Sequence, residues 1–295
     1  MIKEIPFKDH DEWLSIRKQY IGGSDAGAIV GLDEYKTPFS LWAEKTGRVD
    51  GFEGNISTKV GSYLEELVAK MFTEETGKKV RKKNFTLVND KYPFACANVD
   101  RFVVGEKSIL ECKTSTSLPV MKKFRNGEYP ARWYCQVCHY LAVTDLERAY
   151  LAVLVGNREF KVFTIERDEE EIKALMEAEK EFYGYVEKDI PPAFTGLDPD
   201  SEALKVIYKE SASNSPVALF GRETDIETYM ELKAKKKDIE KSIKYYEQVL
   251  QGDLQHNEVG LCGGYTVSWK TQTRAAHMVK ESTFRKFEVK KNKER

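Results

Sequence analysis

Apolar side chains recur at helical spacing in several segments of the chain. The clearest segment covers residues 58–76, where an amphipathic pattern is followed by Gly77, a residue that commonly ends helices. The inward face of this helix is expected to consist of Val60, Leu64, Leu67, Val68, Met71 and Phe72. The same periodicity predicts further helices at residues 11–20, 26–32, 38–47, 130–145, 168–189 and 223–252. Ser24 or Asp25 is expected to cap the helix at 26–32.

Segments rich in β-branched and aromatic residues predict strands between these helices. Strands are expected at residues 85–90, 94–104, 108–115, 148–156 and 159–167, with a further strand pair within 260–274. Tight turns at residues 105–107 and 157–158 close two hairpins. This mixture of helices and strands predicts a compact α/β core.

The character of the sequence changes beyond about residue 195. Residues 196–219 are expected to be loop-rich, and they are followed by the long charged helix, the strand pair and a basic tail at 284–295. The long helix carries apolar residues in alternating steps of three and four, namely Leu232, Ile239, Ile243, Tyr246 and Leu250. The stretch is short and rich in lysine, which argues against an isolated coiled coil. The predicted division is a core at residues 1–195 and a C-terminal appendage at 196–295.

Composition and charge narrow the class of protein only a little. Of the 295 residues, 41% are hydrophobic and 12% are aromatic, which is typical of a folded chain. The 47 basic and 48 acidic side chains nearly cancel, and a local basic groove can lie within such a balanced total. The charged opening does not resemble a signal peptide, and no apolar run approaches the roughly 20 residues of a membrane span. The five scattered cysteines suggest a reducing cytosol rather than a disulfide framework.

The predicted strand at residues 108–115 carries an acid and a base among apolar residues. Side chains two positions apart share one face of a strand, so Glu111 and Lys113 point together while Leu110 and Cys112 point to the other face. A surface salt bridge on an edge strand is one interpretation of this pair. A catalytic site is the other.

A second carboxylate is expected next to Glu111. Closing the hairpin brings Asp100 near it, and two neighbouring carboxylates repel each other unless a cation lies between them. Mg²⁺ takes oxygen ligands of this kind and keeps positions open for water and phosphate. We therefore expect Asp100 and Glu111 to bind Mg²⁺, with the backbone carbonyl of Cys112 as a possible third ligand. Lys113 would orient or deprotonate the attacking water, or stabilise the charge on the phosphorane.

Five blocks, in order along the chain, resemble a known family. They are Arg17 and Ser24 within RKQYIGGSDAGAIVGLDEYKTPFSLWAEKTG, then GSYLEE, then Asp100, then ECK at 111–113, then WYCQVCHYLAVT. This combination resembles the YqaJ-like viral recombinase family, which belongs with the lambda-type alkaline exonucleases of the PD-(D/E)XK nuclease superfamily. The resemblance covers residues 10–190. It implies a restriction-endonuclease-like core in which helices flank a central mixed β-sheet.

The resemblance implies catalytic roles for particular residues. Asp100, Glu111 and Lys113 match the metal-binding and catalytic triad of the family. Glu65 matches a helix carboxylate that reaches a second metal or its water shell, whereas its neighbour Glu66 does not fit the spacing. A further match is the Q-x3-Y element made by Gln136 and Tyr140, which lie four apart on one helical face. Gln136 would hold the scissile strand or the attacking water.

The resemblance also implies a grip on the 5′-terminal phosphate. Arg17 and Ser24 match the pair that performs this task in lambda-type enzymes, where a guanidinium fork suits a phosphate dianion. Asn98 stands where a small hydroxyl residue assists, and Val99 stands at the position of the superfamily's nominal proline, which many members lack. An amide can do similar work at residue 98, although the match is weaker there.

Each of these roles has a plainer structural alternative. Ser24 can be only an N-cap and Arg17 only a surface charge. Glu65 can be a solvated helix residue, and Gln136 and Tyr140 can be helix packing.

Cys135 and Cys138 form a C-x2-C pair inside a predicted helix. Some members of the superfamily carry an iron–sulfur cluster, but here Cys262 is the only cysteine downstream. We therefore expect neither zinc nor an iron–sulfur cluster, and we interpret both cysteines as small apolar residues.

The function implied by the resemblance is a Mg²⁺-dependent exonuclease, for which Mn²⁺ is an alternative metal. It would digest linear double-stranded DNA ends in the 5′–3′ direction and leave 3′ single strands for phage-type recombination. The implied partners are a RecT- or Bet-type single-strand annealing protein and further copies of the chain in a ring-shaped trimer, without a membrane. The implied location is the cytoplasm of a bacterial host, as a phage or prophage protein. Two alternatives stay open, namely an endonuclease or single-strand-directed nuclease, and a catalytically inactive DNA-binding scaffold.

Overall fold

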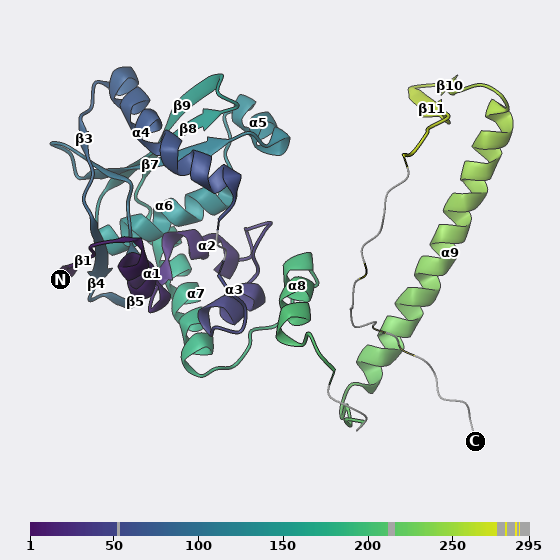
Figure 1. Cartoon of the computed structure of the whole chain (residues 1–295), viewed down its shortest axis with the longest axis horizontal. Coiled ribbons are helices and arrows are strands. Elements are labelled where there is room, and N and C mark those ends of the chain that lie inside the picture. The colour runs from purple at the N-terminus through teal and green to yellow at the C-terminus, as the bar shows by residue number, and fades with distance from the viewer. Residues whose placement is uncertain (52–53, 212–215, 276–280, 282–286, 288, 290–295) are drawn as a thin grey trace. The chain divides into compact units, whose positions relative to one another are not determined.

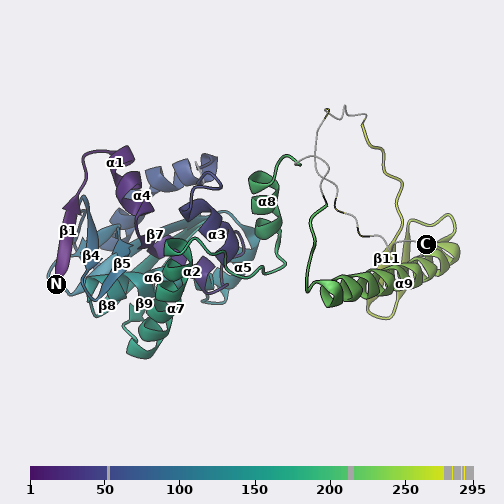
Figure 2. The same ribbon diagram turned by 90° about the horizontal axis from the view of Figure 1, so that it is seen from below.

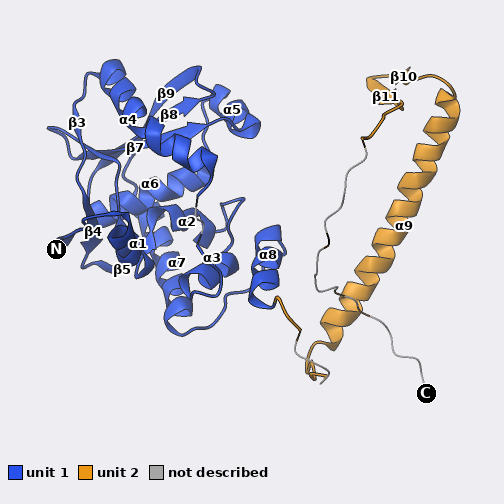
Figure 3. Cartoon of the chain, in the orientation of Figure 1, with its two compact units in different colours: residues 1–208 blue, residues 209–295 orange. Residues whose placement is uncertain are grey.

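The structure is a computed structural model that describes residues 1–51, 54–211 and 216–275, together with Glu281, Phe287 and Val289. The chain forms two compact units, residues 1–208 and residues 209–295 (Figure 3). The division expected at residue 195 stays a prediction. The contacts of the following helix place it in the first unit, because that helix packs against the helix at Pro38–Lys45.

Two sheets form the centre of the first unit (Figure 1). The larger sheet has the order β3-β6-β7-β8-β9. Its strands are β3 Val80–Arg81, β6 Arg101–Val103, β7 Ser108–Ser115, β8 Arg148–Val155 and β9 Glu159–Glu166. β7 and β8 pair in parallel while the other neighbours are antiparallel, so the sheet is mixed.

The smaller sheet has the order β1-β4-β5-β2. Its strands are β1 Ile2–Pro6, β4 Phe85–Asn89, β5 Tyr92–Ala97 and β2 Ile21–Gly22. The N-terminal strand β1 lies along β4, and this pairing was not predicted from the sequence (Figure 2). β2 pairs in parallel with β5 through two residues, which brings Ile21 and Gly22 beside the end of β5.

The single strand expected at residues 94–104 is instead two strands in different sheets. β5 pairs with β4 in the smaller sheet, and β6 pairs with β7 in the larger one. Side chains replace the ladder between them, since Asn98 donates to Thr86 Oγ1 at 2.9 Å and Asp100 accepts from the Cys112 N–H at 2.7 Å. Asp100 therefore lies at the junction of the two sheets.

The described residues of the first unit form eight helices. They are α1 His10–Lys18, α2 Gly23–Ile29, α3 Pro38–Lys45, α4 Ile56–Thr76, α5 Leu118–Arg125, α6 Ala131–Thr144, α7 Glu169–Glu187 and α8 Asp198–Ile207. α4 packs on one face of the larger sheet, where Phe72 meets Leu110, and α6 belongs to the core on the other face with Ile109. The alternation of Ile109 and Leu110 confirms the two faces expected for β7. The expected α/β class, with helices flanking a central mixed sheet, is confirmed.

The inward face expected for α4 is partly wrong. Val68 and Phe72 are buried, but Val60 is 47% exposed and Leu67 is 45% exposed. The cause is that α4 meets the sheet through its C-terminal half, where all of its buried residues lie. Periodicity predicts which residues share a face, but it does not say how much of that face is covered.

The loop-rich segment expected at residues 196–219 contains the helix α8. Asp200 in its first turn accepts hydrogen bonds from Thr37 and from the Thr195 N–H, so the start of α8 is tied to the N-cap of α3. Side-chain contacts far apart in sequence thus stabilise a helix whose local signal is weak.

The second unit contains the long helix α9 Glu223–Leu254 and the hairpin β10 Val259–Cys262 with β11 Tyr265–Ser268. Both elements confirm the sequence prediction. The five apolar residues expected at steps of three and four on α9 are all exposed. The basic tail at 284–295 lies almost entirely outside the described residues. No helix among the described residues is long and apolar enough to cross a membrane.

Candidate functional site

Two carboxylates meet at the junction of the sheets. Asp100 follows β5, and its Oδ2 accepts the Cys112 N–H from the neighbouring strand β7 at 2.7 Å. Glu111 lies in β7 and is only 3% exposed. Both side chains line one cavity of about 190 Å³.

A lysine and a glutamine hold the inner carboxylate. Lys113 Nζ lies 2.7 Å from Glu111 Oε1 and donates to Gln136 Oε1 at 2.8 Å. Gln136 Nε2 donates to the same Glu111 oxygen at 2.8 Å and to the Tyr140 hydroxyl at 2.9 Å. The helix α6 thus presents Gln136 and Tyr140, four residues apart, to the strand that carries Glu111.

The cavity places the Asp100 and Glu111 carboxylates close together. Burial raises the pKa of Asp100 well above its usual range, and the nearby Glu111 and Glu65 add to the rise. Glu111 Oε2 is buried and has no hydrogen-bond partner within the described part of the chain. A buried carboxylate oxygen without a partner is costly unless a cation or a proton meets it. The pair of carboxylates therefore fits a hard divalent cation.

The helix carboxylate Glu65 faces cations of the protein itself. Arg101 donates to Glu65 and, at 2.7 Å, to Glu66, and Lys82 Nζ lies 3.1 Å from Glu65. Among the residues that the structure describes, no three Asp, Glu, His or Cys side chains come close enough to hold a metal ion. A third protein ligand next to Asp100 and Glu111 would therefore be the Cys112 carbonyl, or Glu65 after release from Arg101.

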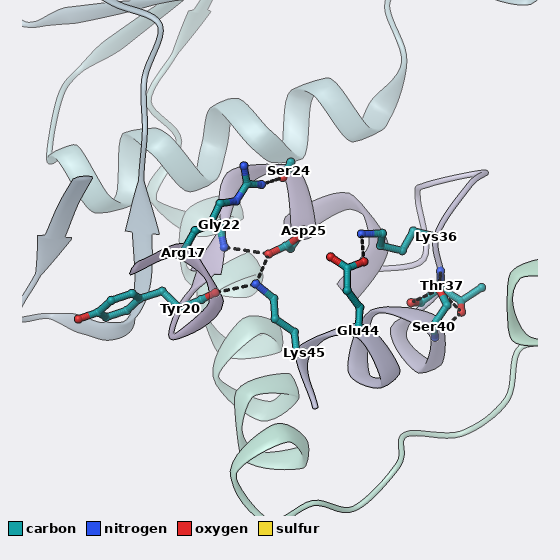
Figure 4. Close-up of polar contacts among 10 residues, drawn as sticks. All are labelled: Arg17, Tyr20, Gly22, Ser24, Asp25, Lys36, Thr37, Ser40, Glu44 and Lys45. Carbon is teal, nitrogen blue, oxygen red and sulfur yellow. Dashed lines mark hydrogen bonds and ion pairs between the residues drawn. The ribbon is translucent and has the colours of Figure 1, made fainter. Parts of the chain in front are cut away.

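Two of the residues expected to hold a 5′ phosphate, Arg17 and Asn98, line the same cavity. Arg17 donates to Ser24 Oγ (Figure 4). The Arg17 guanidinium carbon lies 5.1 Å from the centre of the Trp13 ring. Residues that line the cavity are Trp13, Arg17, Gly22, Gly23, Cys96, Asn98, Asp100, Glu111, Gln136 and Tyr140. The predicted site residues outside this lining are Ser24, Glu65, Cys112 and Lys113. Ser24 and Lys113 nevertheless contact lining residues directly.

The turn before α2 differs from the expected cap. Gly22 is the N-cap residue, and Asp25 is the third helical residue, whose Oδ2 accepts the Gly22 N–H at 3.0 Å. Neither Ser24 nor Asp25 is therefore the N-cap. Burial opposes ionisation of Asp25, but Lys45 and Arg17 together lower its pKa to about 2.

Two glycines of α2 are required by the helix α6, and sequence reasoning missed them. A Cβ atom at Gly23 would lie 2.5 Å from the Tyr140 ring, and one at Gly27 would lie 2.7 Å from Arg132 Cβ. The signal was present as two glycines four residues apart, a spacing that places both on one helical face. Trp13 and Cys96 were also missed as lining residues, because neither carries a motif of its own.

The buried pair of His139 and Glu179 contacts Cys96, which lines the cavity. His139 Nδ1 lies 2.8 Å from Glu179 Oε1, and His139 Nε2 lies 2.8 Å from the Cys96 carbonyl. Burial favours the neutral ring, but the Glu179 carboxylate raises the pKa of His139 above its usual value. His139 thereby links α7 to the end of β5.

Cys135 and Cys138 lie in the buried face of α6. Burial raises the pKa of these thiols to about 11 and about 12, which keeps both protonated at neutral pH. Cys262 lies in β10 of the second unit. The expectation that these residues hold neither zinc nor an iron–sulfur cluster stays a prediction.

Comparisons with known proteins agree with the motif order. The profile of the YqaJ-like viral recombinase domain matches residues 12–147. The uncharacterized protein YqaJ of Bacillus subtilis (strain 168) is 41% identical over 265 residues, which cover 88% of this chain and 83% of that protein.

A solved structure shares the fold of the core. The alkaline exonuclease LHK-Exo of Laribacter hongkongensis has a TM-score of 0.54 at 17% identity, covering 61% of this chain and 94% of its own. The same enzyme in complex with dAMP gives the same values. The fold and the curated relative together confirm the resemblance: the chain belongs to the YqaJ-like viral recombinase family.

Proposed function

We propose that this chain is a divalent-metal-dependent exonuclease that digests linear double-stranded DNA from its 5′ ends. The observation that carries the proposal is the buried carboxylate of Glu111, which lies beside Asp100 in one cavity. Lys113 and Gln136 hold one of its oxygens, and the other has no hydrogen-bond partner in the described parts of the chain. This arrangement suits phosphodiester hydrolysis, which needs a bound cation and an ammonium at the same phosphate.

The residues that would hold Mg²⁺ or Mn²⁺ are Asp100, Glu111 and the Cys112 carbonyl, with Glu65 reaching a second metal or its water shell. The bound metal would supply a Lewis acid and an activated water. Glu65 would first have to exchange Arg101 and Lys82 for that role. The family membership supports this assignment, as does the raised pKa of Asp100, which reflects burial and uncompensated repulsion.

The protein's own groups around the metal would orient the reaction. Lys113 would orient or deprotonate the attacking water or stabilise the charge that develops on the phosphate. Gln136 would hold the scissile strand or the water, since its amide already bridges Lys113, Glu111 and Tyr140. Hydrogen bonds from one side chain to three partners fix its position before substrate binds.

The 5′ direction rests on Arg17, Ser24 and Asn98. Arg17 and Asn98 line the same cavity as the carboxylates, and Ser24 contacts Arg17. A guanidinium can bind a terminal phosphate through two parallel hydrogen bonds. A phosphate held there would place the end of the strand next to the hydrolytic groups, so that short products are released from the 5′ end.

The wider role follows from the family. We place the chain in phage-type recombination, where it would leave 3′ single strands for an annealing protein of the RecT or Bet type in the bacterial cytoplasm. A ring-shaped homotrimer would keep the duplex threaded and so make digestion processive.

A digestion assay tests the function directly. The chain is mixed with Mg²⁺ and either a linear duplex labelled on one strand or a covalently closed circle. We expect loss of each strand from its 5′ end and an intact circle. Cutting of the circle would indicate an endonuclease, and binding without digestion would indicate an inactive scaffold.

A further inference from the structure

A buried ion pair lies beneath the cavity, outside the residues assigned so far. Asp25 is 4% exposed, and Lys45 Nζ from α3 lies 2.8 Å from its Oδ2 (Figure 4). Both side chains are almost completely withdrawn from water. Burying two charges costs free energy that their attraction alone often does not recover, so such a pair suggests a role beyond stability.

Both members of the pair also hold backbone atoms of one short segment, residues 20–22, which contains the strand β2. Asp25 Oδ2 accepts the Gly22 N–H at 3.0 Å, and Lys45 Nζ donates to the Tyr20 carbonyl at 2.7 Å. The two hydrogen bonds bracket residues 20–22, and Figure 4 shows them meeting at the two charges. The ion pair therefore fixes the backbone at both ends of the segment 20–22.

Gly22, in this segment, lines the cavity and lies next to the Arg17 guanidinium. A Cβ atom at Gly22 would be 3.2 Å from Arg17 Nε, so the guanidinium lies directly over the glycine backbone. The Trp13 ring, 5.1 Å from the guanidinium carbon, limits Arg17 as well. The guanidinium therefore occupies the space that a side chain at residue 22 would need, so its place depends on where the Gly22 backbone lies.

Asp25 also acts on Arg17 through its charge. The pKa of Asp25 falls to about 2 in spite of burial because Lys45 and Arg17 both stabilise its ionised form. The Asp25 carboxylate is thus charged at neutral pH and attracts Arg17 toward the segment 20–22. Meanwhile Arg17 donates to Ser24 at the cavity edge.

We propose that Asp25 and Lys45 are positioning residues for the recognition of a 5′-terminal phosphate, acting through Gly22 on Arg17. This inference rests on the proposed function, because it assumes that Arg17 binds the phosphate. The pair does not touch the substrate. The pair fixes the position and direction of the Arg17 guanidinium, which binds the phosphate.

The test measures kcat/KM on duplexes with a 5′-phosphate and on the same duplexes with a 5′-hydroxyl. Asp25→Asn and Lys45→Met are each expected to lower the phosphate-to-hydroxyl ratio about tenfold, mainly through a higher KM for phosphorylated ends. Lys36→Met is the matched control. Lys36 forms a neighbouring ion pair with Glu44 at 2.6 Å, and Figure 4 shows no bond from this pair to Tyr20 or Gly22. Its ratio is expected to equal that of the unaltered chain.

A double variant separates positioning from stability. Asp25→Asn with Lys45→Met leaves no unpaired buried charge, so its thermal stability is expected to recover relative to either single variant. Its phosphate-to-hydroxyl ratio is expected to stay low, because Lys45 no longer holds the Tyr20 carbonyl. A ratio that recovers together with stability would overturn the proposal.

Gly22→Ala gives a second route if the charge variants do not fold. The backbone at Gly22 is extended and accepts alanine, while the new Cβ displaces Arg17 and leaves the ion pair intact. The same loss of ratio is expected, and an unchanged ratio would contradict the proposal. The unaltered chain tests the proposed function separately. Equal rates on 5′-phosphate and 5′-hydroxyl duplexes would show that the chain does not recognise the 5′ phosphate.

Discussion

Gln136 and Glu111 are joined by a hydrogen bond of 2.8 Å that connects α6 to β7. The same carboxylate oxygen also lies 2.7 Å from Lys113. One oxygen of Glu111 is therefore fully engaged by the protein, while the other is buried and has no hydrogen-bond partner among the residues that the structure describes. This asymmetry leaves one oxygen for a metal ion and keeps the ammonium close to it.

Lys113→Ala is expected to slow digestion of linear duplex by about 10²–10⁴-fold, the range for a lost proton-transfer or charge-stabilising group. Binding of the duplex is expected to change little, since Lys113 would act only at the scissile phosphate, one of many phosphates that a bound duplex presents. Single-turnover kinetics and fluorescence anisotropy measure the two effects. Lys107→Ala is the control, because Lys107 is exposed and pairs with Glu147 at the surface. A wild-type rate in Lys113→Ala would exclude its catalytic role.

Arg17→Ala is expected to erase the preference for phosphorylated 5′ ends. The loss on those ends is about tenfold to a hundredfold, because hydrogen bonds to a charged group contribute about 1.5–3 kcal/mol. Digestion rates of phosphorylated and hydroxyl ends give the ratio. Lys18→Ala, an exposed neighbour in the same helix, should keep the preference. A preference retained by Arg17→Ala would place the phosphate grip elsewhere.

Asp100→Asn is expected to raise the melting temperature of the metal-free protein. The pKa of Asp100 is raised by burial and by Glu111 and Glu65, so the folded state disfavours the ionised form. Stability therefore falls as pH rises above the pKa of the unfolded chain, and the amide removes this loss at neutral pH. Calorimetry with and without Mg²⁺ measures the effect. Mg²⁺ should stabilise the unaltered chain but not Asp100→Asn, and equal stabilisation of both would argue against a metal at this residue.

Asp25→Asn is expected to flatten the acid dependence of stability. The folded state lowers the pKa of Asp25 from 3.8 to about 2, so its contribution is complete above the unfolded value and is lost as pH falls through the folded one. A shift of this size corresponds to about 2 kcal/mol between pH of about 4 and about 2. Urea unfolding at several pH values in this window measures it. An identical slope in the variant and the unaltered chain would show that other groups dominate.

Gly23→Ala is expected to destabilise the core by about 1–3 kcal/mol through overpacking. The new Cβ would lie 2.5 Å from the Tyr140 ring, which must move and disturb its hydrogen bond with Gln136. Gly184→Ala is the control, because no atom lies within 4 Å of its added Cβ and its helix should gain stability. Chemical denaturation compares the two. Equal stabilities would mean that α2 shifts away from α6 at no cost.

Local patterns predicted most of the elements because they are local properties. The strand period placed Glu111 and Lys113 on one face of β7 and Leu110 and Cys112 on the other, and the structure confirms both faces. The amphipathic pattern of 58–76 and the stop at Gly77 are likewise seen in α4. Backbone geometry determines these periods whatever lies on the other side of the element.

Predictions failed where the outcome depended on a distant partner. The segment 94–104 has uniform strand character, yet it divides between two sheets because Asn98 and Asp100 find partners in Thr86 and Cys112. α4 leaves Val60 uncovered for the same kind of reason, since burial depends on the length of the surface it meets. No local pattern contains that information.

The sequence by itself determined most of the helices and strands, the two faces of β7 and the family, because these depend on local period and on residues in a particular order. Only the tertiary structure decided that Arg17 and Glu111 share one cavity and that Glu65 is held by Arg101. It alone paired Asp25 with Lys45. Contacts between residues far apart in sequence depend on how whole elements pack, and packing is a property of the folded chain.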